Sequence, residues 1–245
     1  MTLKMDVSIV VITYNHGSFL RNCLLSCINQ QKSNLTYEII VVNDGSTDDT
    51  EKIFNQFRHE KINFFSRKNE GIEKSANFAF GQSRGDYIVR VDADDALMPD
   101  YLSVLGDFLD TEAAFFYPNY IEIDEMGNEL KLVNLPEFDP NEILSRGDFL
   151  ATGTLLRADV IKKFRGYREK MVNSGLENYE LIIDVILEGL SGKHISSPLF
   201  KYRRHNQNLS LLKRQEIIEN GYDLFLRKNL GNFRTNKFHP YDLQV

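Results

Sequence analysis

Short apolar runs alternate with longer amphipathic segments over the first hundred residues. Val7–Ile12, Glu38–Val42, Ile62–Phe65 and Tyr87–Val91 are apolar runs of strand length. From Ser18 onward, apolar side chains recur at helical spacing after the first run. Nearly continuous apolar runs are typical of strands covered on both faces, and their alternation with helices indicates a parallel sheet. The pattern predicts an α/β fold with a mostly parallel central sheet flanked by helices.

The alternation becomes looser after residue 98. We predict helices at 99–109, 157–164 and 176–190, strands at 113–117 and 149–156, a hairpin joining 120–123 to 130–133, and a looser connection over 134–149. A helix capped by Ser46 or Thr47 is expected to carry Asp48, Asp49 and Glu51 in its first turn. We expect one main domain over 1–211, with halves at 1–98 and 99–211, and a helical extension over 212–245.

Polar clusters follow three of the predicted strands. Thr13–Asn15 comes after the first strand, Asn43–Gly45 after the second, and Asp92–Asp95 after the fourth. Ligands of open parallel sheets bind beyond the carboxyl ends of the strands. We therefore expect these three clusters to converge on one ligand site.

The acidic end of the fourth strand suggests a metal. Asp92, Asp94 and Asp95 fall within four residues, and adjacent carboxylates repel one another unless a cation lies among them. Hard oxygen ligands suit Mg²⁺ or Mn²⁺, which commonly hold substrate phosphates as well. The alternative is a solvated acidic loop in which Asp95 or Asp100 caps the next helix.

Composition and charge limit the class of protein. The 245 residues are 42% hydrophobic, without an apolar run long enough for a membrane span and without a secretory signal at the start. Cys23 and Cys27 lie one helical turn apart, which suits two buried thiols in a reducing cytoplasm. The net charge of −6 divides into −12 over residues 1–161 and +6 over 162–245. The basic part could neutralise a phosphate-bearing ligand or contact the inner face of a membrane peripherally, or it could be an ordinary solvated surface. No nucleic-acid partner is expected.

The motifs in their order resemble family 2 glycosyltransferases. The matching residues are Val7–Asn15, Ile40–Asp48, Asn69 and Gly71 through Asn77 to Tyr87, and Asp92–Asp95. The resemblance is dense over roughly the first 100 residues and looser to about residue 210. It implies the A-type glycosyltransferase (GT-A) fold, which is Rossmann-like, with a small acceptor-side region.

The resemblance assigns residues to the donor. Thr13, Tyr14 and Asn15 would line the nucleotide pocket, and Asp44 would accept a hydrogen bond from the nucleobase, usually uracil. Asn43 replaces the first of two acidic residues that the family often has there. A simple turn at Asp44 is the alternative.

The resemblance also places phosphate and metal contacts. Lys74 would face the phosphates, although it could equally be a solvated helix residue. Asp94 would ligate the metal directly, while Asp92 and the adjoining Ala93 would contact the donor, with Asp92 near the ribose and metal-bound water. His205, in the segment Tyr202–His205, would complete the metal shell, unless it is an ordinary core or surface histidine.

The chain departs from the family at the general base. The family has a Glu-Asp pair at the start of a late helix, and its Asp takes the proton of the acceptor hydroxyl. Asn178 stands at that position here, and an amide has no basic lone pair at physiological pH. Glu177 or Glu180 could supply the carboxylate, or both could belong to a solvated acidic stripe.

The implied function is a metal-dependent inverting glycosyltransferase that uses Mn²⁺ or Mg²⁺. Its donor would be a nucleotide-diphosphate sugar, with a UDP-sugar favoured, and its acceptor a glycan or lipid-linked hydroxyl in polysaccharide synthesis. The alternative is a catalytically impaired nucleotide-sugar-binding protein, which the Asn178 replacement motivates. A nucleotidyltransferase would want a Gly-rich phosphate loop after the first strand, and Thr13–Gly17 is not one.

Overall fold

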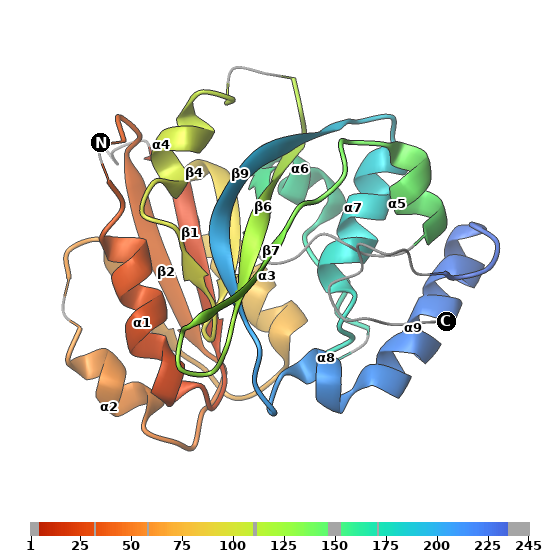
Figure 1. Cartoon of the computed structure of the whole chain (residues 1–245). Coiled ribbons are helices and arrows are strands. Elements are labelled where there is room, and N and C mark those ends of the chain that lie inside the picture. The colour runs from red at the N-terminus through yellow and green to blue at the C-terminus, as the bar shows by residue number, and fades with distance from the viewer. Residues whose placement is uncertain are drawn as a thin grey trace.

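A computed structural model describes residues 5–31, 33–57, 59–109, 112–146, 153–170 and 172–234. Within these residues the strands form one nine-stranded sheet in the order β3-β2-β1-β4-β8-β6-β9-β5, with β7 paired to β6 (Figure 1). The strands are β1 (Met5–Thr13), β2 (Tyr37–Asn43), β3 (Ile62–Ser66), β4 (Gly85–Asp92), β5 (Ala96–Leu97), β6 (Phe115–Ile123), β7 (Glu129–Val133), β8 (Leu155–Arg157) and β9 (Gly192–Arg203). The helices are α1 (Gly17–Ile28), α2 (Thr50–Asn55), α3 (Ile72–Gln82), α4 (Tyr101–Gly106), α5 (Pro140–Arg146), α6 (Ala158–Phe164), α7 (Glu177–Leu187), α8 (Leu209–Leu212) and α9 (Arg214–Lys228).

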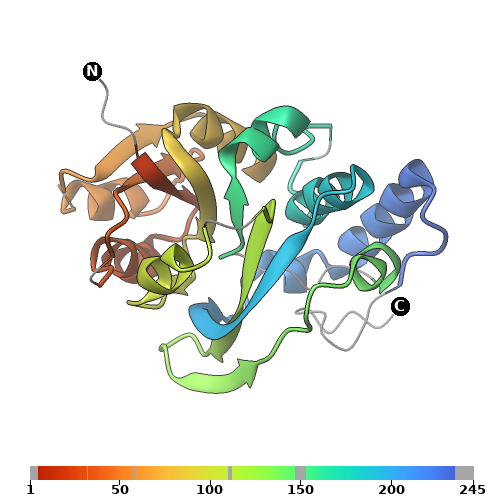
Figure 2. The same ribbon diagram turned by 90° about the horizontal axis from the view of Figure 1, so that it is seen from above.

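The first half of the sheet is parallel, as its apolar runs predict. β1 lies between β2 and β4, and β3 continues the parallel half at the edge. Right-handed crossovers place α1 and α2 on one face, whereas the reversed step from β3 back to β4 places α3 on the other (Figure 2). The carboxyl ends of β1, β2 and β4 therefore open on the same edge.

The second half makes the sheet mixed. β8 is antiparallel to both β4 and β6, β6 and β9 run parallel, and β6 and β7 form the predicted hairpin. The prediction of two strands at 113–117 and 120–123 was wrong, because both belong to β6. Pro118 is tolerated there because the register between β6 and β9 shifts on either side of Asn119.

Several predicted boundaries also differ. α2 begins at Thr50, so Asp48 and Asp49 precede its first turn, and α4 is shorter than the predicted 99–109. α5 lies inside the predicted loose connection, and β9 was not predicted. The strand expected at 149–156 lies partly outside the described residues, and its described end forms β8.

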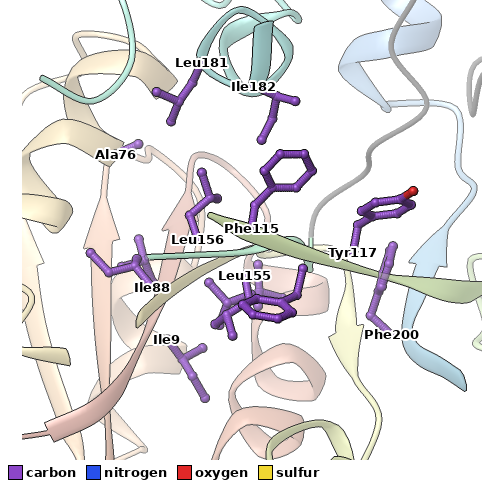
Figure 3. Close-up of a cluster of buried hydrophobic side chains, with 14 of the residues drawn as sticks. Ile9, Ala76, Ile88, Phe115, Tyr117, Leu155, Leu156, Leu181, Ile182 and Phe200 are labelled. Carbon is purple, nitrogen blue, oxygen red and sulfur yellow. The ribbon is translucent and has the colours of Figure 1, made fainter. Parts of the chain in front are cut away.

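One apolar core joins both halves of the sheet. Ile9 of β1, Phe115 of β6 and Ile182 of α7 belong to the same buried cluster (Figure 3). Ile217, Leu224 and Phe225 of α9 are buried in this cluster too. The boundary expected at residue 211 stays a prediction.

The described helices include none with the length and apolar composition needed to cross a bilayer. Cys23 and Cys27 are both buried free thiols, as their helical spacing predicts.

Candidate active site

A cavity of about 520 Å³ opens where β1, β2 and β4 end. Residues from all three predicted polar clusters line it. Its polar wall includes Tyr14, Asn15, His16, Asp44, Asn69, Arg90, Asp92, Asp94, Asp95, Asn173, Glu177, Tyr202, Gln207, Asn208 and Ser210. The convergence expected from the strand ends is thus present.

The first two loops are tied together at the cavity. Asn15 has a left-handed backbone (φ 56°), and its side-chain oxygen accepts a hydrogen bond from the Thr47 N–H at 2.8 Å. The Asn15 N–H in turn donates to Ser46 Oγ at 2.9 Å. Asn43, at the position where the family often has an acid, accepts the Ser46 N–H and closes the turn. Asn15 and Asp44 are thereby held on the same wall.

Asp44 is buried and fixes the start of α3. Its Oδ1 accepts the Glu70 N–H at 3.0 Å and the Ser75 hydroxyl at 2.7 Å, and its Oδ2 accepts the Gly71 N–H at 3.0 Å. A carboxylate offers about four lone-pair directions, so one acceptor direction is left for a ligand. Asp44 therefore has a structural role, and it also lines the cavity.

The acidic loop after β4 is anchored from β9. Arg203 is buried, and its Nε donates to the Asp94 carbonyl at 2.7 Å while its backbone N–H donates to Asp95 Oδ1 at 2.8 Å. The Asp95 N–H closes a turn onto the Asp92 carbonyl. One carboxylate oxygen of Asp95 is thus occupied by a backbone hydrogen bond, whereas Asp92 and Asp94 present their carboxylates at the cavity.

Asp94 is paired with His205. His205 Nε2 lies 2.9 Å from Asp94 Oδ2, and the His205 ring is buried against Phe19. Burial alone would raise the pKa of Asp94, but the hydrogen bond from His205 and the electrostatic influence of His16 and His205 lower it below its usual value. Asp94 therefore faces the cavity as an ionised carboxylate.

Arg90 connects Asp92 to Glu177. Its Nε lies 3.2 Å from Asp92 Oδ1, and its Nη1 lies 2.7 Å from Glu177 Oε1, with the Arg90 and Glu177 side chains nearly buried. Burial raises the pKa of Asp92 to about 6 against the lowering effect of Arg90, and the charges of Asp94 and Glu177 add to the rise. The Arg90 guanidinium thus pairs with a carboxylate from β4 and with one from α7.

The side chains around Asp94 provide part of the ligand set of a divalent cation. In an octahedral site with ligands at about 2.1 Å, neighbouring ligand atoms lie about 3 Å apart, and Asp94 Oδ2 and His205 Nε2 have this separation. Asp92 Oδ1 is a buried oxygen whose contact with Arg90 Nε at 3.2 Å is an ion pair without hydrogen-bond geometry, and the described structure gives it no hydrogen bond. In the same part of the chain, no three His, Cys, Asp or Glu side chains form a complete metal centre. An ion held by these described residues would take its remaining ligands from a bound molecule or from water.

Five of the residues assigned from the sequence, Thr13, Lys74, Asn178, Glu180 and His205, do not line the cavity. Thr13 is fully buried, and Lys74 pairs with Glu70 at 3.3 Å on the surface of α3. Asn178 lies 3.4 Å from the Tyr167 hydroxyl, on a separate, much smaller cavity. Glu180 pairs with Arg168, Arg227 and Lys228. Tyr14, Asn15, Asp44, Asp92, Ala93, Asp94 and Glu177 line the cavity, and His205 contacts it through Asp94.

Sequence reasoning did not single out Arg90 or Asn173, which both line the cavity. Arg90 did leave a signal, because it is a lone charge in an apolar strand, two residues before Asp92 and hence on the same face. Asn173 lines the cavity in a left-handed conformation (φ 54°) and left no such signal.

Comparison with known proteins decides the family. The model of Glycosyl transferase family 2 matches residues 8–176, more than half of the chain. The chain belongs to glycosyl transferase family 2. The match begins in β1 and ends just before Glu177, so it includes the three polar loops of the cavity.

Named relatives agree with the family. Chondroitin synthase of Escherichia coli is 28% identical over 237 residues, which are 95% of this chain and 34% of the synthase. An uncharacterized glycosyltransferase of Haemophilus influenzae is 30% identical over 187 residues, which are 74% of this chain and 72% of that protein. This family 2 chain therefore spans about a third of the length of the chondroitin synthase it matches.

A solved structure agrees with the fold. S. aureus TarS 1-349 in complex with UDP-GlcNAc superposes with a TM-score of 0.74 at 20% identity, covering 93% of this chain and 67% of that one. At this identity the likeness shows the fold alone. The GT-A prediction for the chain is confirmed.

Proposed function

We propose that this family 2 protein is a metal-dependent inverting glycosyltransferase. It would transfer a sugar from a nucleotide-diphosphate donor, preferably a UDP-sugar, to a hydroxyl of a glycan or lipid-linked acceptor. The observation that carries the proposal is the single cavity at the ends of β1, β2 and β4, which brings a nucleotide-side loop, two strand-end carboxylates and the start of α7 to one place.

The donor assignment rests on the loops after β1 and β2. Tyr14 and Asn15 lie on the same cavity wall as Asp44, whose remaining acceptor direction suits the N–H of a uracil. TarS has been solved with UDP-GlcNAc and with UDP, and a mannosyltransferase of Pyrobaculum calidifontis with GDP-Man and Mn²⁺. These ligands define the first compounds to test here.

Asp94 would hold the cation, with Asp92 nearby and His205 either as a further ligand or as the group that orients Asp94. When bound, Mn²⁺ or Mg²⁺ supplies positive charge that stabilises a departing diphosphate. The ionised state of Asp94 and the burial of its partner His205 support this role. Oxygens of the diphosphate would supply further ligands beside those of the described residues.

Glu177 is the carboxylate best placed to accept the proton of the acceptor hydroxyl. It is the member of the Glu177, Asn178 and Glu180 set that lines the cavity. Its Oε1 is held by Arg90, while its Oε2 lies 3.5 Å from the Ser174 hydroxyl, too long for a strong hydrogen bond. Oε2 can therefore accept a proton as the hydroxyl attacks the anomeric carbon on the face opposite the diphosphate.

The Asn178 replacement does not favour a silent binding protein. Asn178 points toward Tyr167, and the cavity retains the carboxylate of Glu177. No specific observation supports the impaired alternative.

A thermal-shift screen with and without Mn²⁺ tests the donor, using UDP-GlcNAc, UDP-glucose, UDP-glucuronate and GDP-mannose. A ligand at 100 times its Kd stabilises a fold by about 2.7 kcal/mol, so the true donor class should stand out by a Mn²⁺-dependent shift. Release of UDP in the presence of glycan acceptors then measures transfer. Absence of any nucleotide-dependent shift, or the same shift without Mn²⁺, would contradict the proposal.

A further inference from the structure

We propose that Glu73 is a positioning residue of the transfer reaction. It holds the segment that begins α7 and, through that segment, the carboxylate of Glu177. The inference rests on the proposed function, in which Glu177 accepts the acceptor proton.

Glu73 lies in the first turn of α3 and is 1% exposed. Its Oε2 accepts the Asn173 N–H at 2.8 Å, and its Oε1 accepts the Ser174 N–H at 2.7 Å. The Asn173 side chain returns a bond, because its Oδ1 accepts the Ile72 N–H at 3.0 Å. Three hydrogen bonds thus join the start of α3 to two consecutive residues about a hundred positions later.

The held segment leads directly into the candidate base. Ser174 Oγ accepts the Leu176 N–H at 3.3 Å and lies 3.5 Å from Glu177 Oε2. Glu177 is the first residue of α7, and its other oxygen is paired with Arg90 at 2.7 Å. A shift of Ser174 would therefore move the helix start and turn the Glu177 carboxylate in the cavity.

Neighbouring side chains pack closely around residues 172–175. Any shift of these residues would therefore also break the hydrogen bonds from Asn173 and Ser174 to Glu73. A Cβ added at Gly71 would come within 2.6 Å of Val172, and one added at Gly175 would come within 2.6 Å of Ile217 in α9. The Ser174 carbonyl accepts the Asn220 side chain of α9 at 2.9 Å. The segment is wedged between α3 and α9, and Glu73 satisfies its two N–H groups from one side.

A carboxylate suits this task better than an amide, because both of its oxygens accept hydrogen bonds. Glutamine at position 73 would present an NH₂ group to one of the two buried N–H donors. The carboxylate is costly, since burial and the nearby Glu177 charge raise the pKa of Glu73 against the lowering effect of the two N–H groups.

The test is a kinetic cycle built on Glu73→Gln and Glu177→Gln. A misplaced catalytic group can cost up to about 100-fold, so kcat of Glu73→Gln at saturating donor should fall by roughly 10- to 100-fold. Calorimetric affinity for UDP with Mn²⁺ should stay close to that of the parent. In the Glu177→Gln background the Glu73 substitution should add little, because both act on the same step.

Glu38→Gln is the matched control. Glu38 is also buried, and it lies at the opposite end of the strands. Its Oε1 accepts the Arg84 backbone N–H at 2.7 Å and the Ser8 hydroxyl at 2.8 Å, and its Oε2 pairs with the Arg84 guanidinium at 2.6 Å. It should lose thermal stability to a similar extent without losing kcat. Hydrogen exchange of the 173–176 amides should become faster in Glu73→Gln and stay unchanged in Glu38→Gln. If Glu73→Gln does not fold, Asn173→Gly removes the returned bond to Ile72 while allowing the positive φ, and the same kinetic split is expected.

The outcomes separate this inference from the proposed function. Slow transfer by Glu177→Gln together with parental kcat in Glu73→Gln would overturn the positioning role and leave the base assignment intact. Fully multiplicative losses in the double variant, or unchanged exchange at 173–176, would overturn it as well. Parental transfer by Glu177→Gln would instead remove the base assignment, and the positioning role would fall with it.

Discussion

At the scale of single residues, the pairing of each carboxylate separates those that can act from those that hold structure. Asp95 accepts a hydrogen bond from the Arg203 backbone N–H, and Glu180 is ion-paired with Arg168, Arg227 and Lys228. Glu177 has one cation on one oxygen and faces the cavity with the other. Residue type alone does not distinguish Glu177 from Glu180, one turn away, whereas their partners do.

The first prediction concerns Glu177. Glu177→Gln should slow sugar transfer by about 10² to 10⁴, or roughly 2.7–5.4 kcal/mol of barrier, because the amide cannot accept the proton. Glu180→Gln, a substitution of the same type outside the cavity, should transfer at nearly the parental rate. The measurement is UDP release at saturating donor.

Asn178→Asp serves as the second comparison. Asn178 faces Tyr167 and the smaller cavity, so restoring the family's acid should change the rate little. A large gain in rate from Asn178→Asp, or equal losses in the two glutamine variants, would contradict the assignment of the base to Glu177.

The second prediction concerns Asp94. Asp94→Asn should weaken Mn²⁺-dependent UDP binding by about tenfold or more, since even partners one step removed from a metal contribute 10- to 100-fold to affinity. Asp49→Asn changes an exposed aspartate paired loosely with Lys52 and should bind UDP as the parent does. Calorimetry with and without Mn²⁺ measures both. Equal Mn²⁺ dependence in Asp94→Asn and the parent would place the cation elsewhere.

At the scale of elements, the spacing of apolar residues predicted those helices and strands whose positions are determined by interactions close in the sequence. β1, β2, β4, α1 and α7 were predicted within a few residues, because their apolar positions recur at the period of the element. β9 was missed because Ser196–Pro198 interrupts its pattern, and its pairing partner β6 is far away in the sequence. α5 was missed because Pro136 and Pro140 favoured reading the segment as a loop.

The same limit applies to the candidate site. The strand-end clusters were predictable, since parallel strands must end at a common edge. The contact from Glu73 to Asn173 spans about a hundred residues, and no periodicity reports such a contact. Whether a carboxylate is free or ion-paired depends on these distant contacts, and this is why Glu177 and Glu180 remained equivalent in the sequence.

The third prediction belongs to α3, whose start Asp44 holds. Asp44→Asn should destabilise the fold by about 1–3 kcal/mol, because one of three bonded donors faces an NH₂ group. If Asp44 also receives a nucleobase N–H, UDP affinity should fall in the same variant. Ser75→Ala removes a donor to Asp44 without changing the carboxylate. It should destabilise less and leave UDP affinity intact.

Urea unfolding measures the role of Asp44 in stability, and calorimetry measures its role in UDP binding. Reduced stability with parental UDP affinity would leave Asp44 as the anchor of α3 only. Parental stability would contradict the hydrogen bonding described for Asp44 itself.

At the scale of the whole molecule, the basic C-terminal third of the chain contributes α8 to the rim of the cavity. Leu209 and Leu212 line the cavity, and Leu209, Leu211 and Leu212 are 36%, 59% and 68% exposed. α8 lies between β9 and α9, beside the edge where the strands of the parallel half end (Figure 1). Exposed aliphatic side chains at the rim of a polar cavity suit an acyl or isoprenoid chain better than a sugar ring, which usually stacks on aromatic faces.

The fourth prediction follows from this rim and from the proposed lipid-linked acceptor. A fully buried leucine contributes roughly 1.5–3 kcal/mol, and 1.4 kcal/mol is a factor of ten in affinity. Leu211→Ser together with Leu212→Ser should therefore weaken sedimentation with vesicles of phosphatidylglycerol and phosphatidylethanolamine by about tenfold or more. Met126→Ser, at an 86% exposed position on the β6–β7 turn, is the control and should sediment as the parent does.

Salt separates the two contributions to such binding. The basic C-terminal third should add an electrostatic part that weakens as ionic strength rises, while the leucine part should persist. Parental sedimentation by the double serine variant would exclude α8 as the contact. Failure of the parent to sediment at low salt would restrict the acceptor to a glycan reached from solution, and it would leave the leucines of α8 as part of the cavity rim alone.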